Sequence, residues 1–378
     1  MPDAQNTAAV DLLKDLVRFP SLSHEEAEIA GFVEQCVREV GLPARRRDDN
    51  VIFWLGTGDD GTNDTLLLNT HLDVVPPSDD HPYDPFTPTE RDGCLYGRGT
   101  VDAKASAATM TTALLELAAD GYEPPGDGRV MVALTTCEET GGGYNGLKAI
   151  RSHLPDLDAA LVGEPTDLQP CVAQKGLLIL HVTAHGETAH AARSHLGENA
   201  ILKAARDLRP LEDFSLDRED PFLGAPTVTV TVIEGGSANN VVPDRCTFTL
   251  DIRSTPAYTH DEITAQVAGR LESHVEVHSD RIVPVATDPD ERIVRACRRA
   301  LSDDAEPFGS PTASDWIFLT DVPTVKLGPG SSEQSHTPGE HIALAEIPRA
   351  VESYKRIIQN YFAKETAVRT DPGSRKSN

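Results

Sequence analysis

The chain is short of positive charge. Its 378 residues carry 60 acids against 34 bases, giving a formal net charge of −26, and only nine of the bases are lysines. Such a charge repels nucleic acid and anionic membranes, so the sequence argues against both as partners. The acids are spread along a patterned chain, which we interpret as an acidic, halophile-like surface for a salt-rich cytosol.

Long apolar runs and paired cysteines are also missing. No stretch approaches the run of about 18 apolar residues that a membrane-spanning helix needs. Residues 1–7 are polar and do not resemble a secretory signal peptide, so we expect a cytoplasmic protein. The six cysteines show no Cys-x-x-Cys spacing, which indicates neither a thiolate zinc site nor a disulfide framework.

The length and the hydrophobic patterning predict two domains, because 378 residues exceed what one core usually organises. The first part alternates helical patterns with apolar runs, as in α/β proteins: helices 8–19, 24–40 and 106–120, and strands 51–55, 66–68 and 130–136. After residue 176 the order becomes β-α-β-β-α-β, with strands 177–184, 227–233, 245–252 and 275–278 and helices 199–208 and 260–273. We therefore predict a discontinuous catalytic domain, 1–175 and 285–378, with an inserted ferredoxin-like α+β lid, 176–284.

Two potential metal-binding segments lie in the first third of the chain. His71 and Asp73 end an apolar strand, whose period of two places both on one face, so that the carboxylate can orient the imidazole. Asp102 follows two glycines and precedes an Ala-rich helix. Each also has a simpler interpretation, because a His-x-Asp pair is common at surfaces and an Asp before a helix is often its N-cap.

The remaining candidates occupy similar positions. Glu138 and Glu139 follow a strand and precede a glycine run, at the carboxyl end of the strand where α/β sites form, and Glu164 repeats that position. His336 lies in a polar loop. Taken singly, adjacent acids and a loop histidine are more often solvent-exposed. Taken together, the five segments supply carboxylate and imidazole for two zinc ions and a spare carboxylate, which is the minimum for a two-metal hydrolase.

These motifs resemble, in their order and over residues 8–362, the dinuclear-zinc amidohydrolases that include acetylornithine deacetylase, succinyl-diaminopimelate desuccinylase, aminoacylase and glutamate carboxypeptidase. The resemblance implies a zinc-peptidase-like α/β catalytic domain, with a mixed sheet flanked by helices, that carries the lid. Several segments look most like the acetylornithine deacetylase branch: Gly163–Thr166, Lys175–Gly176, Ala189–Arg193, Asn240–Pro243 and Leu327–Gly330.

The resemblance also implies a ligand set for two zinc ions per chain, which cobalt or manganese can replace. Asp102 bridges both ions. His71 and Glu164 complete one site, and Glu139 and His336 complete the other. Two such cations lower the pKa of a shared water towards neutrality.

Glu138 is left over as the general base in this scheme. A free carboxylate takes a proton from the water and returns it to the leaving amine, so Glu138 cannot also be a ligand. Asp73 completes the catalytic set. The resemblance further implies a cis peptide bond between Asp102 and Ala103.

The lid supplies the remaining expected contacts. By resemblance His190 donates to the oxyanion from the lid of a partner subunit, in a homodimer formed through the lids. Asn240 reaches the neighbouring site, and Arg253 grips the substrate carboxylate with its planar fork. Gly328 and Gly330 are further substrate-binding candidates. A salt bridge with a nearby acid is an equal alternative for Arg253.

The implied activity is zinc-dependent hydrolysis of the amide bond of an N-acyl amino acid. N-Acetylornithine deacetylation in arginine biosynthesis is the first expectation, because the closest motifs fall in that branch and the acidic surface tolerates the δ-ammonium group. Alternatives are succinyl-diaminopimelate desuccinylase and deacylases of N-acetyl-lysine, N-succinylornithine or acetylcitrulline. Glu164 argues against a di- or carboxypeptidase, whose relatives usually carry Asp there, and Glu138 argues against a non-catalytic metal-binding dimer.

Overall fold

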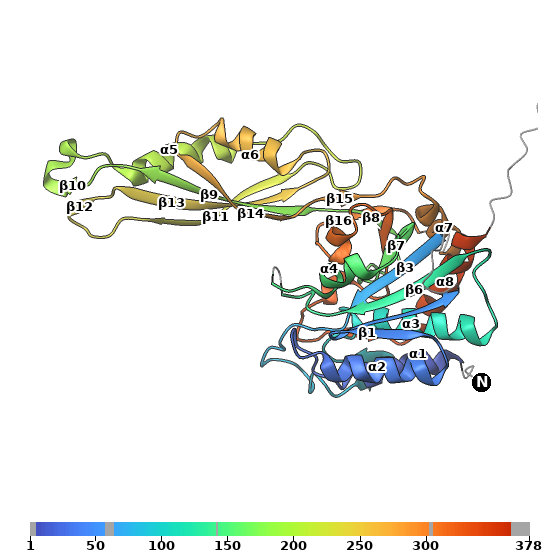
Figure 1. The fold of residues 1–378 in the computed structure, drawn as a ribbon. Helices are drawn as coiled ribbons and strands as arrows, with labels where there is room; N and C mark the ends of the chain where they lie inside the picture. Colours follow the sequence, from blue (N-terminus) through green and yellow to red (C-terminus); the bar gives the residue numbers. More distant parts are fainter. Residues whose placement is uncertain (1–4, 57–63, 141–142, 302–304, 364–378) are drawn as a thin grey trace, which may run out of the picture.

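A mixed sheet of nine strands forms the centre of the structure, a computed structural model that describes residues 5–56, 64–140, 143–301 and 305–363 (Figure 1). In sheet order the strands are β1 (Ala44–Arg47), β2 (Asn50–Gly56), β6 (Gly128–Thr135), β3 (Asp64–His71), β7 (Ala159–Val162), β17 (Thr324–Lys326), β8 (Cys171–Gln174) and β15 (Val285–Ala286), with β16 (Phe308–Ser310) beside β8. The central strands β6, β3, β7 and β17 run parallel to one another, whereas β1, β2 and β15 pair antiparallel. The α/β fold with a mixed sheet, expected from the sequence, is confirmed.

Helices cover both faces of this sheet, so its central strands are buried along nearly their whole length. Within β3, Leu66 and Leu68 point to one core and Leu67 points to the other. The first core is closed by α1 (Gln5–Val17), α2 (Ala27–Glu39), α3 (Lys104–Ala119), α7 (Arg292–Ala300) and α8 (Glu346–Phe362). The second core is closed by α4 (Gly146–Ile150) and the 3₁₀ turn η3 (Asp315–Phe318).

A second, antiparallel sheet extends away from the first as an arm (Figure 1). Its strands, in sheet order, are β11 (Thr227–Gly235), β13 (Arg245–Ser254), β9 (Gly176–His185) and β14 (His274–Ile282). The helices α5 (Ala200–Glu212) and α6 (His260–Ala268) pack on one face and bury a separate apolar cluster. This is the β-α-β-β-α-β order expected from the sequence.

Shorter elements complete the described chain. A three-stranded sheet joins β4 (Thr89–Arg91), β5 (Cys94–Tyr96) and β18 (His341–Ala343), and β10 (Ala189–His190) pairs with β12 (Val241–Val242). The other 3₁₀ turns are η1 (Arg151–His153), η2 (Ala191–Leu196) and η4 (Ser332–Gln334). None of the helices in the described segments has the length and apolar character of a membrane span.

Two helices are shorter than their sequence patterns predict. The helix expected from residue 24 begins at Ala27, because His24 has a φ of +74°, which is incompatible with a right-handed helix. The helix expected to reach residue 273 ends at Ala268, where Gly269 follows as its C-cap. The later start of α2 matters for the candidate site described below, because Glu26, just before this helix, contacts the turn after β6.

Candidate metal centre

The sheet brings four of the predicted site residues to one edge. His71 is the last residue of β3, Glu138 and Glu139 follow β6, and Glu164 follows β7. Because β6, β3 and β7 are parallel neighbours, their carboxyl ends meet at the same edge of the sheet. Asp102 joins them from the turn before α3.

Three groups of three residues that could hold a metal ion form there. Two of them share Asp102, and the third joins His71, Glu138 and Glu139. In the first cluster that shares Asp102, His71 Nε2 lies 3.2 Å from Asp102 Oδ1 and 3.8 Å from Glu164 Oε1. In the second cluster, His336 Nε2 lies 2.9 Å from Glu139 Oε1 and 3.5 Å from Asp102 Oδ2. Each carboxylate oxygen of Asp102 therefore serves one cluster, which is the geometry needed to bridge two ions.

The charges of the site fit divalent cations. Burial, together with the charge of Asp102, raises the pKa of Glu164 to about 8, and burial, together with Glu164, raises the pKa of Glu138 well above its usual range. Burial would also raise the pKa of Asp102, but its hydrogen bond with His71 lowers it to about 2. Such crowded carboxylates are stabilised by a cation, and mixed oxygen and imidazole donors suit zinc, cobalt or manganese. The residues present therefore fit two divalent ions.

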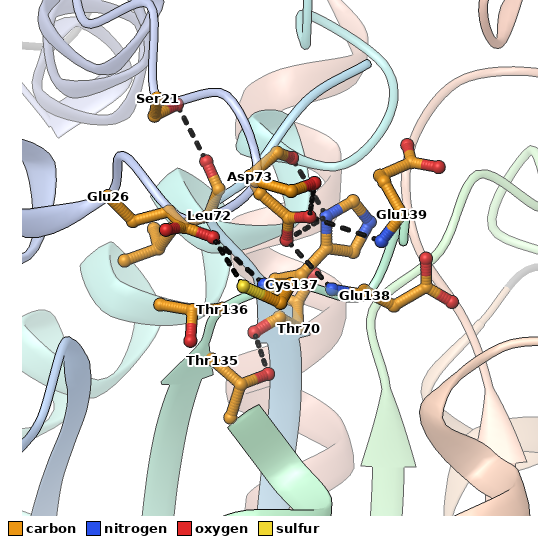
Figure 2. Close-up of polar contacts among 12 residues, drawn as sticks. Ser21, Glu26, Thr70, Leu72, Asp73, Thr135, Thr136, Cys137, Glu138 and Glu139 are labelled. Carbon is orange, nitrogen blue, oxygen red and sulfur yellow. Dashed lines mark hydrogen bonds and ion pairs between the residues drawn. The ribbon is translucent and has the colours of Figure 1, made fainter. Parts of the chain in front are cut away.

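Asp73 holds both the imidazole and the two-glutamate turn (Figure 2). His71 Nδ1 donates to the backbone oxygen of Asp73 over 3.0 Å, which leaves Nε2 facing the other ligands. The Asp73 carboxylate accepts the backbone N–H groups of Glu138 and Glu139, each over 3.1 Å, and the hydroxyl of Ser23 over 2.7 Å. The imidazole is thus held by the backbone oxygen of Asp73, while the carboxylate that was expected to orient it lies 3.5 Å from Nδ1.

Glu26 is a positioning residue that the sequence did not reveal. It is buried, and its Oε1 accepts the backbone N–H of Cys137 over 2.9 Å and the thiol of Cys137 over 3.3 Å (Figure 2). Asn50 Oδ1 accepts the N–H of Thr136 over 3.1 Å. With Asp73, side chains therefore hold four consecutive N–H groups, 136–139, and this fixes where the following glutamates point. An acid just before α2 looks like an ordinary surface residue in the sequence.

Replacing Glu26 with alanine is expected to lower kcat about tenfold and to destabilise the protein by about 1–3 kcal/mol, the cost of a buried donor without an acceptor. Glu26→Gln keeps an acceptor for the Cys137 N–H and should retain most of the kcat. Cys137→Ser, which leaves the backbone bond intact, is the matched control. Kinetics at saturating metal, with denaturant unfolding, measure both effects. Equal kcat for Glu26→Ala and the wild type would refute the positioning role.

A buried ion pair holds the bridging residue. The guanidinium of Arg98 donates to Glu340 over 2.7 Å, and both side chains are almost fully buried. Glu340 also accepts the backbone N–H groups of Gly99, Val101 and Asp102, at 3.0, 2.9 and 3.2 Å. The peptide bond after Asp102 is cis, as the resemblance implied. The turn carrying Asp102 is therefore tied to the loop that carries the second histidine.

The lid residues do not reach this centre within one chain. His190 and Asn240 lie around the β10 and β12 pair, at the far end of the arm from the nine-stranded sheet (Figure 1). His190 is exposed, and its Nδ1 accepts the backbone N–H of Ala192 over 3.0 Å. Their predicted contacts with substrate require a second subunit and stay predictions.

The other residues expected to contact the substrate are Arg253, Gly328 and Gly330. Arg253 forms a two-bonded ion pair with Asp251, at 2.9 and 3.2 Å, which is the alternative weighed from the sequence. A Cβ on Gly328 would lie 2.5 Å from the carbonyl oxygen of Glu164, so this glycine permits close packing behind a metal ligand. Gly330 has a φ of +82°. None of the three lines the two cavities beside the acids.

Two cavities that share lining residues open at the centre. The smaller, about 190 Å³, is lined by the acids of both clusters, by His336 and by Lys326, a buried lysine whose ammonium donates to Ser310 Oγ over 2.9 Å. The larger, about 620 Å³, shares Glu138 and Glu139 with it and extends towards the root of the arm. A substrate can thus reach Glu138 from the larger cavity.

Known proteins match this chain over most of its length. The model of Peptidase family M20/M25/M40 matches residues 67–360. Succinyl-diaminopimelate desuccinylase 2 of Ruegeria sp. (strain TM1040) is 29% identical over 402 residues, covering 97% of this chain and 98% of that protein. Among solved structures, the aminopeptidase PepT of Bacillus cereus has a TM-score of 0.76 at 23% identity, and YxeP of Bacillus subtilis, described as a dinuclear metal binding peptidase, has a TM-score of 0.71 at 15%. Both comparisons cover 94% of this chain and 98% of the other, and they show that the fold is shared.

Proposed function

The chain belongs to the peptidase M20/M25/M40 family, and from this premise we propose that it hydrolyses the amide bond of an N-acyl amino acid using two divalent metal ions. One observation carries the proposal: the two ligand clusters share Asp102, and Glu138 stands beside them without being needed by either. A hydrolase of linear amides requires this separation between the residues that hold the metal and the residue that moves the proton.

The chain's own residues account for the proton transfers. When bound, the two ions supply Lewis acidity and a lowered pKa for water. Glu138 accepts a proton at its carboxylate and returns it to the nitrogen of the leaving amine. Asp73 and Glu26 keep Glu138 in place through the backbone bonds described above. Zinc is the proposed metal, with cobalt or manganese as substitutes, because the clusters combine imidazole with carboxylate.

For the substrate we place an N-succinyl amino acid, as in succinyl-diaminopimelate desuccinylase, ahead of N-acetylornithine. The sequence motifs favoured N-acetylornithine and hence a role in arginine biosynthesis. The 29% identity to a desuccinylase, over nearly the whole of both chains, supports the succinyl alternative better. The similarity to the aminopeptidase does not bear on the choice of substrate, because at 23% identity it shows a shared fold alone.

A substrate panel tests this proposal. Purified protein with zinc or cobalt at high salt is offered N-succinyl-diaminopimelate, N-succinylornithine, N-acetylornithine, N-acetyl-lysine and simple di- and tripeptides. We expect turnover of acyl amino acids and the highest kcat/KM for a succinyl compound. Turnover of peptides alone would replace the proposal with a peptidase.

We also propose that the arm, 176–284, is a lid through which two chains form a homodimer. The long strand β11 is the outermost of its sheet, and Val230, Val232 and Ile233 on it are exposed. Open strand edges of this kind favour pairing with another chain. The remote position of His190 is explained if it serves the partner's centre. A fully active monomer in solution would contradict this arrangement.

A further inference from the structure

We infer that Lys148 and Arg281 receive the free carboxylate of an acidic acyl group, so that the enzyme selects amides of dicarboxylic acids over acetyl amides. This inference rests on the proposed function and adds the residues that choose the acyl group. Most residues that line the larger cavity, apart from Glu138 and Glu139, have no role in the proposed proton transfers.

We infer the position of the substrate from the residues that line both cavities. They share Glu138 and Glu139, so a carbonyl placed at the acids beside Glu138 has its substituents facing the 620 Å³ cavity. The main-sheet wall of that cavity includes Lys148 on α4 and Phe318 on η3. The arm contributes Leu177 from β9 and Arg281 from β14.

The walls combine apolar and basic groups. Leu177, Ile179, Ile317 and Phe318 offer an apolar surface to methylene groups, and the Lys148 ammonium lies 5.9 Å from the centre of the Phe318 ring. Arg281 supplies a guanidinium, whose planar fork binds a carboxylate through two parallel hydrogen bonds. A chain of methylene groups that ends in a carboxylate therefore suits a cavity lined by both kinds of residue.

Hydrogen bonds of Asn145 fix the backbone at the start of the helix that carries Lys148. Asn145 caps α4 by accepting the N–H of Lys148 over 3.0 Å, and its amide donates to the buried carboxylate of Asp315 over 2.7 Å. Asp315 also accepts the hydroxyl of Thr135, at the end of β6 beside the catalytic turn. The helix carrying Lys148 is thus tied to the strand that carries the general base.

The net negative charge of the chain makes the positions of Lys148 and Arg281 relevant to the choice of substrate. A chain with a net charge of −26 repels anionic substrates as a whole, so binding one requires local positive charge. Arg253, the carboxylate-binding candidate from the sequence, does not line this cavity. Lys148 and Arg281 are basic residues that line this cavity, the first from α4 and the second from β14, where its Nε donates to Ser279 Oγ over 3.5 Å.

Length decides between the acyl groups. The far carboxylate of a succinyl group lies three carbon–carbon bonds from the scissile carbonyl carbon, a reach of roughly 4 Å. An acetyl group ends after one bond and presents no charge. Of these two groups, only the succinyl group carries a carboxylate that the cations lining this cavity can bind.

The test compares three acyl groups, succinyl, butanoyl and acetyl, on whichever amino acid the wild type turns over best. Butanoyl has the same number of carbons as succinyl without the carboxylate. We expect the wild type to prefer succinyl to butanoyl. Lys148→Gln and Arg281→Gln should each reduce that kcat/KM ratio about 10- to 100-fold, mainly through KM for the succinyl compound, as expected for loss of a charge-assisted hydrogen bond.

Two control variants accompany the series. Arg281→Lys keeps the charge and should restore part of the ratio, and Lys203→Gln, on α5 outside the cavity, should leave it unchanged. A wild type that prefers butanoyl or acetyl, or variants with an unaltered ratio, would overturn this inference while the proposed function stands. Failure to hydrolyse any of the three acyl groups, on any amino acid tried, would overturn the proposed function itself.

Discussion

Glu138→Gln is expected to lower kcat by about 100- to 10,000-fold, the range typical of a lost general base, while metal content and KM stay close to wild type. Glutamine has the volume of glutamate but cannot accept the proton from water. Glu138 belongs to neither of the two clusters that share Asp102, so a centre built on those two clusters should keep its metal in this variant. Loss of metal would instead assign the ligands to the group of His71, Glu138 and Glu139.

The adjacent glutamate is the matched control. Glu139 Oε1 lies 2.9 Å from His336 Nε2, so Glu139→Gln should weaken one metal site. Its activity should recover in part with added zinc, whereas that of Glu138→Gln should not. Steady-state kinetics with elemental analysis separate the two. Retention by Glu138→Gln of more than roughly a tenth of wild-type turnover would show that another group is the base.

Asp102→Asn is expected to abolish activity and to weaken the binding of both ions by more than about 100-fold. Loss of a partner that only supports a ligand costs about 10- to 100-fold in metal affinity, and Asp102 contacts both clusters directly. The amide keeps the shape of the side chain but removes the charge that two cations share.

Single-cluster variants provide the comparison for Asp102. His71→Ala and His336→Ala should each impair one site and leave the other able to bind metal, which titration with cobalt can follow by absorbance. If Asp102→Asn lost only one ion, or no more than either histidine variant, Asp102 would not be the bridge.

The sequence indicated candidate site residues because their signals are local. Each of His71, Glu138 and Glu164 follows an apolar strand, and neighbouring parallel strands end at one edge, so strand order alone brings them together. The alternation of helices and strands likewise predicted an α/β fold and the β-α-β-β-α-β order of the arm. Those inferences needed only periodicity and the direction of the strands.

The supporting contacts lack such a signal because they join distant parts of the chain. Glu26 is 111 residues from Cys137, and Glu340 is 238 residues from Asp102. In the sequence each resembles one more surface acid in a chain with 60 acids. Only the packing of the N-terminal segment and the C-terminal loop against the sheet edge shows that both are buried and bonded to backbone N–H groups.

Arg253 marks another limit of sequence reasoning. Arg253 lies on β13, two residues from Asp251, and residues i and i+2 of a strand point to the same face. The sequence therefore allowed either substrate binding or a local ion pair. The structure has the ion pair. Which basic groups line the cavity depends on how the root of the arm packs beside α4, and no periodicity in the sequence encodes that arrangement.

The central claim is that two ions bind between the clusters that share Asp102, and metal stoichiometry tests it most directly. Elemental analysis of active, dialysed protein should find about two divalent transition-metal ions per chain. Activity should be lost with chelator and return with zinc, cobalt or manganese as the second equivalent is added. Full activity in protein that contains no transition metal would contradict the account.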